Sequence, residues 1–174
     1  PKDGITYPYY TLQRYFTDAN AAVAANASTT LSSANIQLNS VPRRMYVYAR
    51  TRNQDRTFLT NDTFFQINNI SLNWQNRQGL LSSATASDLY NMSVKNGCQL
   101  SWQQWQGVQR NLTGAVVTSF GSVGGVLCLD FAEDIALDSL SAPGTLGTYQ
   151  LQLQLGVTNI NQTLAITPSL VIIV

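Results

Sequence analysis

The sequence contains no histidine among its 174 residues. Without an imidazole the chain cannot build a Ser-His-Asp triad, and it lacks the usual side chain for proton transfer near neutral pH and for metal binding. Charged residues are also scarce, at 11% of the chain, and the formal net charge is +1. Nucleic-acid-binding domains usually carry a concentrated basic surface, so nucleic acid is not expected as a partner.

Cysteines and long apolar runs are equally scarce. The two cysteines, Cys98 and Cys128, are too few for a disulfide-built scaffold and lack the spacing of a zinc site. No run reaches the roughly 18 apolar residues of a membrane span. The chain opens with Pro1-Lys2-Asp3-Gly4 instead of a methionine or a signal sequence, so we expect a piece of a longer protein.

Hydrophobic residues, in contrast, make up 44% of the chain, and aromatic residues make up 10%. This content is enough to bury the core of one ordinary domain, so residues 1–174 are predicted to form a single domain. Asn, Gln, Ser and Thr replace the missing charges, which predicts a polar but uncharged surface.

The stretch from 59 to 107 has the most informative pattern. Its apolar residues alternate, but the parity changes between Phe65-Gln66-Ile67 and Ile70-Ser71-Leu72. Because successive strand residues face opposite sides, this change predicts a β-bulge at Asn68-Asn69. Thr85 to Asp88 then offers N-cap oxygens, and Asn96-Gly97 offers a stop, so a helix is predicted between them.

Period-two alternation is typical of the remaining apolar segments. Residues 98–103 are predicted to form a strand after the helix, and 110–114 a turn. Further strands are predicted over residues 7–16, 31–38, 45–49, 115–120, 127–131, 149–158 and 164–174. About eight strands at this spacing predict an all-β fold, an antiparallel β-sandwich of the eight-stranded jelly-roll type with one short inserted helix.

The acidic residues Asp130, Glu133, Asp134 and Asp138 form the only acidic cluster. Their spacing misses the alternate-residue ligand pattern of an EF-hand loop, and nothing places a substrate between two of the carboxylates. A solvated loop with a carboxylate capping a turn is the simpler interpretation. We expect no catalytic residues, no metal site and no cofactor, and the chain is not expected to be an enzyme.

The aromatic residues leave one alternative open, a glycan- or receptor-binding β-sandwich. Trp102 and Trp105 cannot share one face of an alternating strand unless the strand ends between them. Core packing is therefore the preferred interpretation of Trp74 and Trp102.

Several phrases, in order, resemble the second jelly roll of double jelly-roll major capsid proteins of virophages, Polinton-like viruses and their large DNA-virus relatives. The phrases are QINNISLNWQNRQGLLSSATASDLYNMSVKNG, SWQQWQG, VLCLDFAEDIALD with its following APG, and GTYQLQLQLGVTN. The similarity runs from Val41-Pro42 onward. The resemblance implies the C-terminal jelly roll of a longer, non-catalytic capsid protein that assembles into trimeric pseudo-hexagonal capsomers of an icosahedral shell.

The resemblance also implies the partners and the location. The partners would be other copies of the capsid protein in a trimer, its N-terminal jelly roll, and penton and minor capsid proteins. The protein would be made inside the infected host cell and would reside in the virion.

An interface is predicted from two strands. Tyr46 and Tyr48 occupy the second face of a strand whose first face is aliphatic, and the run from 170 to 174 is apolar at consecutive positions. Such surfaces exceed what monomers usually expose, so we expect them to be covered by another jelly roll. The suspected interface residues are Tyr46, Tyr48, Leu170, Ile172 and Val174.

Both cysteines lie among apolar neighbours, so we predict buried free thiols. Intact mass spectrometry of unreduced protein should give the mass of the dithiol form. A loss of two hydrogens would instead show a disulfide.

Overall fold

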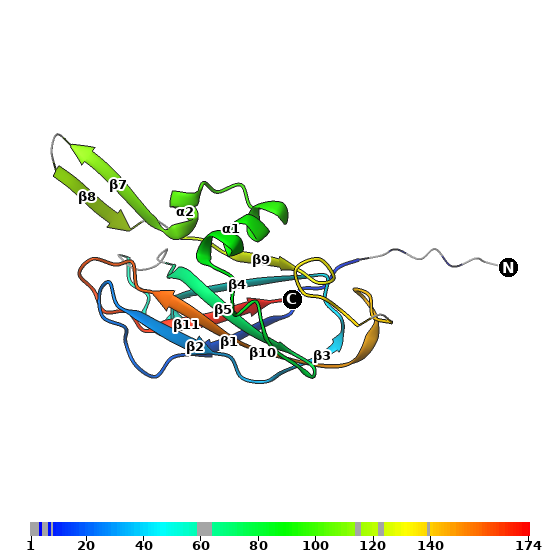
Figure 1. Cartoon of the computed structure of the whole chain (residues 1–174). Coiled ribbons are helices and arrows are strands. Elements are labelled where there is room, and N and C mark those ends of the chain that lie inside the picture. Colours follow the sequence, from blue (N-terminus) through cyan, green and yellow to red (C-terminus); the bar gives the residue numbers. More distant parts are fainter. Residues whose placement is uncertain are drawn as a thin grey trace.

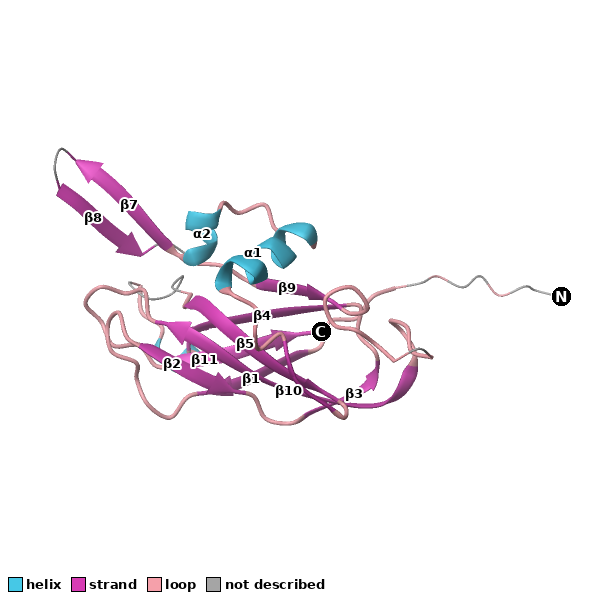
Figure 2. Ribbon diagram, viewed as in Figure 1, coloured by secondary structure: helices cyan, strands magenta, loops and turns pink. Residues whose placement is uncertain are grey.

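The structure is a computed structural model that describes residues 4, 7, 9–58, 64–113, 116–121, 124–138 and 140–174. Two antiparallel sheets pack face to face, a pair of helices lies along one edge, and a separate hairpin projects beyond them (Figures 1 and 2). The predicted antiparallel sandwich is confirmed. Neither helix in the described residues has the length and apolar character needed to cross a membrane.

The first sheet has the strand order β1-β11-β4-β9. Its strands are β1 (Arg14–Asp18), β11 (Pro168–Ile173), β4 (Arg44–Thr51) and β9 (Leu127–Asp130).

The second sheet has the order β2-β10-β5-β6, and β3 also pairs with β10. Its strands are β2 (Ser28–Ser32), β3 (Ile36–Ser40), β10 (Leu146–Thr158), β5 (Gln66–Trp74) and β6 (Arg77–Leu80). Both β2 and β3 lie on the edge of β10 opposite to β5, so the strand predicted over 31–38 is an interrupted one. The other elements are η1 (Asn53–Asp55), α1 (Ala86–Lys95), α2 (Trp102–Gln106), β7 (Val108–Thr113) and β8 (Val116–Gly121).

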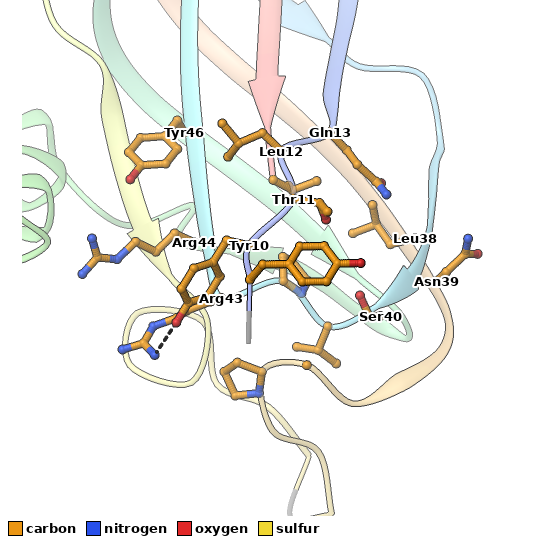
Figure 3. A pocket seen from close by; sticks show the side chains of 16 residues that line it. Tyr10, Thr11, Leu12, Gln13, Leu38, Asn39, Ser40, Arg43, Arg44 and Tyr46 are labelled. Carbon is orange, nitrogen blue, oxygen red and sulfur yellow. Dashed lines mark hydrogen bonds between the residues drawn. The ribbon is translucent and has the colours of Figure 1, made fainter. Parts of the chain in front are cut away.

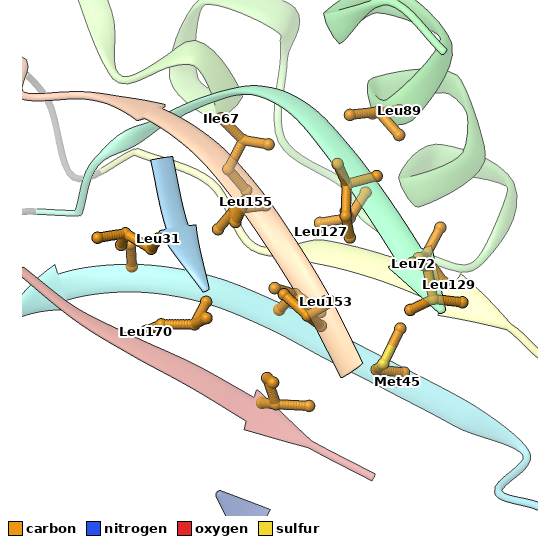
Figure 4. Packing of buried hydrophobic residues seen from close by; sticks show 14 of the residues in the cluster. Leu31, Met45, Ile67, Leu72, Leu89, Leu127, Leu129, Leu153, Leu155 and Leu170 are labelled. Atoms are coloured by element: carbon orange, nitrogen blue, oxygen red, sulfur yellow. The ribbon is translucent and has the colours of Figure 1, made fainter. Parts of the chain in front are cut away.

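The core lies between the inner faces of the two sheets (Figure 4). Alternate side chains of each strand form this core, as in β4, where every second residue is buried. The buried residues of β4 and β10 include Met45, Val47, Ala49, Leu151, Leu153 and Leu155. Trp74 also belongs to the core, stacking on Tyr149 with ring centroids 5.4 Å apart, which confirms the prediction for this indole.

The predicted bulge in β5 is confirmed. Asn69 pairs with Gly156 and Ile67 with Val157, so Asn68 is the extra residue between them. The buried side chains therefore change parity between Ile67 and Ile70, and both reach the same core.

The predicted helix is also confirmed as α1. Thr85 is its N-cap, and a capping box links the Thr85 and Asp88 side chains to each other's backbone N–H groups. Asn96 forms the C-cap. The hydrogen bonds from Thr85 lower the pKa of the Asp88 carboxyl, as expected for a carboxylate that accepts donors at a helix start.

The strand predicted over 98–103 is wrong, because residues 102–106 form the helix α2. Ser101 accepts from the Gln104 N–H, and the Gln104 side chain accepts from the Ser101 N–H, which makes a second capping box. Gly107 then ends the helix in the left-handed conformation at φ 74°. This local signal outweighs the period-two pattern, so the sandwich carries two short helices instead of one.

Three further boundaries differ from the prediction. The first strand begins at Arg14 and not at Tyr7, because its partner strand β11 ends opposite Arg14 at Ile173. Residues 108–113 form β7 where a turn was predicted over 110–114. Strand β11 begins at Pro168, which has no N–H to donate, so residues 164–167 of the strand predicted over 164–174 lie outside it.

Helix α1 is held against β9 by side chains that bond to the strand backbone. The Asn96 amide donates to the Cys128 carbonyl oxygen at 3.0 Å and to an Asp134 carboxylate oxygen at 2.6 Å. The Ser93 hydroxyl accepts from the Cys128 N–H at 3.2 Å. These contacts satisfy the free edge of β9 where a further strand would otherwise pair.

Both cysteines are free in the structure, and Cys128 is buried as predicted, but Cys98 is only half-buried, so the predicted burial of Cys98 is wrong. Burial raises the pKa of the Cys128 thiol, because the thiolate would lose its hydration there.

Substitution at Gly125 is expected to destabilise the fold. A Cβ there would lie 2.6 Å from the Trp105 carbonyl oxygen, which is backbone and cannot rotate away. Gly125→Ala should lower the free energy of unfolding by about 1–3 kcal/mol in urea titrations. Gly156→Ala is the matched control, because the three atoms nearest to its Cβ would belong to the side chain of exposed Asn69, which can rotate away. Equal losses for the two variants would contradict this account.

Removal of the Asn96 amide should also destabilise the fold, since the buried Cys128 carbonyl oxygen loses this donor and the half-buried Asp134 carboxylate keeps only its bond from the Asp130 N–H. We expect Asn96→Ala to cost about 1–3 kcal/mol of unfolding free energy. Asn91→Ala, on the exposed side of the same helix, should change it by less than about 0.5 kcal/mol. Thermal denaturation followed by circular dichroism would test both, and an unchanged Asn96→Ala midpoint would refute the anchoring role.

Candidate functional site

The face of the first sheet that points away from the core is the strongest candidate for a functional surface. We define the outer face as nine outward residues of β1, β11 and β4, three of the four strands of this sheet: Arg14, Phe16, Asp18, Ser169, Val171, Ile173, Tyr46, Tyr48 and Arg50. Strand register arranges them in three rows. The rows are Arg14-Ile173-Tyr46, Phe16-Val171-Tyr48 and Asp18-Ser169-Arg50. An apolar and aromatic strip therefore crosses the sheet with an arginine on either side.

The predicted interface residues divide between the two faces. Tyr46 and Tyr48 lie half-buried on the outer face. Leu170 and Ile172, each 1% exposed, pair with Ala49 and Val47 and pack in the core of the domain.

Val174 also packs against the core. The burial of Leu170 and Ile172 is thus explained within this domain, and they cannot contribute the outward surface predicted for them, whereas Val174 is only half-buried. The outward apolar residues of β11 are Val171 and Ile173, which the consecutive apolar run could not distinguish by parity.

Aromatic rings cover the centre of the outer face. Val171 is fully buried although it lies outside the core cluster, and its neighbours in the row are Phe16 and Tyr48. Tyr48 also contacts Phe64, with ring centroids 5.4 Å apart. Phe16 remains 62% exposed, as an aromatic anchor for a partner would be.

The two arginines lie close to these rings. The Arg14 guanidinium carbon is 5.7 Å from the Phe16 ring centroid, and that of Arg50 is 5.8 Å from the Tyr48 centroid. At this separation a cation is attracted to the ring face. Partial burial lowers the pKa of Arg50, and the positive charges of Arg56 and Arg14 lower it further.

A second aromatic group, on the helices, was missed by the sequence analysis. Trp102 and Trp105 stack at 6.0 Å between ring centroids, and the Tyr90 ring meets the Trp102 ring edge-on at 5.3 Å. Trp105 is buried, but Trp102 is 40% exposed, so the predicted core position of Trp102 is wrong. The helical turn of α2 brings the two indoles to one side, which an alternating strand would not have done.

The acidic cluster has its own protein partners. Asp134 accepts from the Asp130 N–H at 2.9 Å as well as from Asn96, so it caps the turn after β9. Ion pairs join Arg44 to Asp130 at 3.6 Å, Lys95 to Glu133 at 2.7 Å and Arg77 to Asp138 at 2.6 Å.

The pairing with Lys95 lowers the pKa of the Glu133 carboxyl. No group of three or more acidic or cysteine side chains suited to a metal ion occurs within the described ranges. The acidic residues therefore serve the local structure of this loop.

A pocket of about 700 Å³ opens at one end of the first sheet (Figure 3). The N-terminal segment crosses it at Tyr10 and Leu12, and the Arg43 guanidinium donates to the Tyr10 hydroxyl at 3.3 Å. Tyr46 and Val174, two of the suspected interface residues, also line it. The pocket is continuous with the outer face through Tyr46.

Comparison with known proteins relates this chain to viral capsid proteins. It is 38% identical over 178 residues to the putative capsid protein V20 of Sputnik virophage, an alignment that covers 97% of this chain and 30% of that protein. It superposes on a chain of the 3.5 Å cryo-EM structure of the Sputnik virophage with a TM-score of 0.87 and 35% identity, covering 99% of this chain and 37% of that chain.

The crystal structure of the mavirus major capsid protein has the same fold, with a TM-score of 0.76 at 14% identity, covering 94% of this chain and 36% of that one. The chain thus spans about a third of the length of the proteins it matches. Residues 12–174 match the family described as "Major capsid protein V20 C-terminal domain". With nearly all of its sequence accounted for in this way, the chain belongs to the family of the C-terminal domain of the major capsid protein V20.

Proposed function

We propose that this chain is a structural module of a viral capsid shell, and that it acts by packing against another jelly roll and not by catalysis. The observation that carries the proposal is the outer face, an aromatic strip with a well-exposed Phe16 on a domain whose own core is already complete. Monomeric domains rarely expose such strips without a partner. Because the chain belongs to a family of capsid proteins, we expect this partner to be another capsid jelly roll.

The missing partner is, in this proposal, the N-terminal jelly roll of the same capsid protein. The matched relatives are about three times as long as this chain, which leaves room for a second domain of similar size. Three such proteins would form a pseudo-hexagonal capsomer of an icosahedral shell, with penton and minor capsid proteins as further neighbours. The protein would be made in the infected host cell and would reside in the virion.

The low charge of the chain suits this role. With charged residues at only 11%, contacts between copies would depend mainly on apolar burial and amide hydrogen bonds, with few charge pairs. Such contacts weaken little with ionic strength, because screening acts on exposed charges.

The glycan- or receptor-binding alternative has one supporting observation, the half-exposed Trp102 beside Tyr90. An indole with a phenol at its edge provides one platform of the kind that sugars use. The capsid role is preferred because the outer face is broader and spans three strands.

Replacement of the aromatic anchor tests the proposal in the full-length capsid protein. Phe16→Ser should reduce the yield of assembled particles roughly tenfold or more, since a buried aromatic anchor commonly contributes 2 kcal/mol or more to an interface. Gln152→Ser, on the outward side of the second sheet, is the matched control and should assemble normally. Sedimentation and electron microscopy give the readout.

Circular dichroism melting curves must show that the Phe16→Ser variant is folded. Normal particle yield from the folded Phe16→Ser protein would contradict the proposed use of the outer face. The alternative would be favoured if the unassembled protein bound to a glycan array and the Trp102→Ala substitution abolished this binding.

A further inference from the structure

We propose that the partner of the outer face is a protein surface that presents carboxylates to Arg14 and Arg50. This inference rests on the proposed function, because it specifies the chemistry of the surface that covers the aromatic strip. It adds the requirement that the partner surface carry carboxylates, which apolar packing alone would not impose.

The two guanidiniums flank the strip from opposite sides. Arg14 lies in the row on one side of Phe16-Val171-Tyr48, at the edge strand β1, and Arg50 lies in the row on the other side, on β4. Each stands within 6 Å of an aromatic ring centroid in that strip. A guanidinium near a ring still has its in-plane N–H groups available, and these match the two oxygens of a carboxylate.

Neither guanidinium has an acidic partner within the described part of the chain. The ion pairs found there use four other basic residues, Arg44, Arg52, Arg77 and Lys95. Asp18 is the one acid among the nine residues of the outer face, and Ser169 of the intervening strand separates it from Arg50 in their row. The outer face therefore carries an excess of positive charge, while most acidic residues elsewhere are paired.

A third arginine lies near Arg50. Arg56 is close enough to Arg50 for its charge to lower the Arg50 pKa, and one of its terminal nitrogens, Nη2, is buried without a hydrogen-bond acceptor. Covering the outer face with an apolar surface alone would bury these cations further without compensation, which is costly. A facing carboxylate offsets the cost by pairing with them.

Nucleic acid is a poorer fit to the same arginines. The chain has a net charge of +1, and the charged positions surround an aromatic and aliphatic strip instead of forming a continuous basic track. Phosphate backbones are bound by many cations along a path. Carboxylates on a largely apolar protein surface match both the charge and the strip.

Carbodiimide crosslinking in assembled particles tests the proposal directly. In the full-length capsid protein, Arg14→Lys and Arg50→Lys place an amine where each guanidinium was. Carbodiimide joins an amine to a carboxylate in contact with it as an amide, with loss of water. Peptide mass spectrometry should find position 14 or 50 joined to Asp or Glu peptides outside the chain described above.

Arg77→Lys is the matched control for the chemistry, because its partner Asp138 lies in the same chain. It should yield the crosslink between positions 77 and 138. Particles with this control crosslink but none from positions 14 and 50 would overturn the inference while leaving the proposed function intact. Failure of the unsubstituted protein to form particles would overturn both.

Charge reversal gives an independent readout. Arg14→Glu with Arg50→Glu should reduce particle yield roughly tenfold or more, because like charges then face each other across the interface. The same double substitution leaves Phe16 and Tyr48 in place, so normal yield would overturn the carboxylate requirement and not the aromatic contact. Fluorescence anisotropy with a labelled DNA oligonucleotide completes the test, and binding that these substitutions abolish would overturn the protein partner in favour of nucleic acid.

Discussion

The packing of β4 and β11 against β10 and β5 is the contact on which the rest of this structure depends. Each of these strands places every second side chain into the space between the sheets, so the parity of its apolar residues fixes its register. The bulge at Asn68 shows how strict this requirement is, because one extra residue is accommodated so that Ile67 and Ile70 both reach the core. Once the inward residues of the first sheet are fixed, the residues that alternate with them must face outward.

The sequence predicted those parts of the fold in which one local signal acts alone. Alternation identified β4 and β10, the change of parity identified the bulge, and Thr85 with Asp88 identified the start of α1. The prediction was wrong where two signals competed. Residues 98–103 alternate, but the reciprocal bonds of Ser101 and Gln104 give a helix that the alternation concealed.

The candidate site was predictable only in part for a related reason. Tyr46 and Tyr48 alternate with aliphatic residues, so their outward position follows from the pattern. The run from 170 to 174 is apolar at every position and contains no parity signal, so the inward Leu170 could not be distinguished from the outward Val171. Only the pairing of β11 with both neighbours decides it. Similarly, the relation of Arg14 to Arg50 depends on strands from opposite ends of the chain, which no local pattern reveals.

The contact between α1 and β9 has a consequence for how the domain opens. The Cys128 backbone is bonded to Ser93 and Asn96, and its Sγ lies 3.9 Å from the Asn96 carbonyl oxygen, so the helix shields the thiol. Modification of buried Cys128 therefore requires a local opening, of which detachment of α1 from the strand is one part, whereas Cys98 is only half-buried. The rate of thiol modification at Cys128 therefore reports on helix detachment. The rate at Cys98 serves as the internal reference, so no engineered probe is needed.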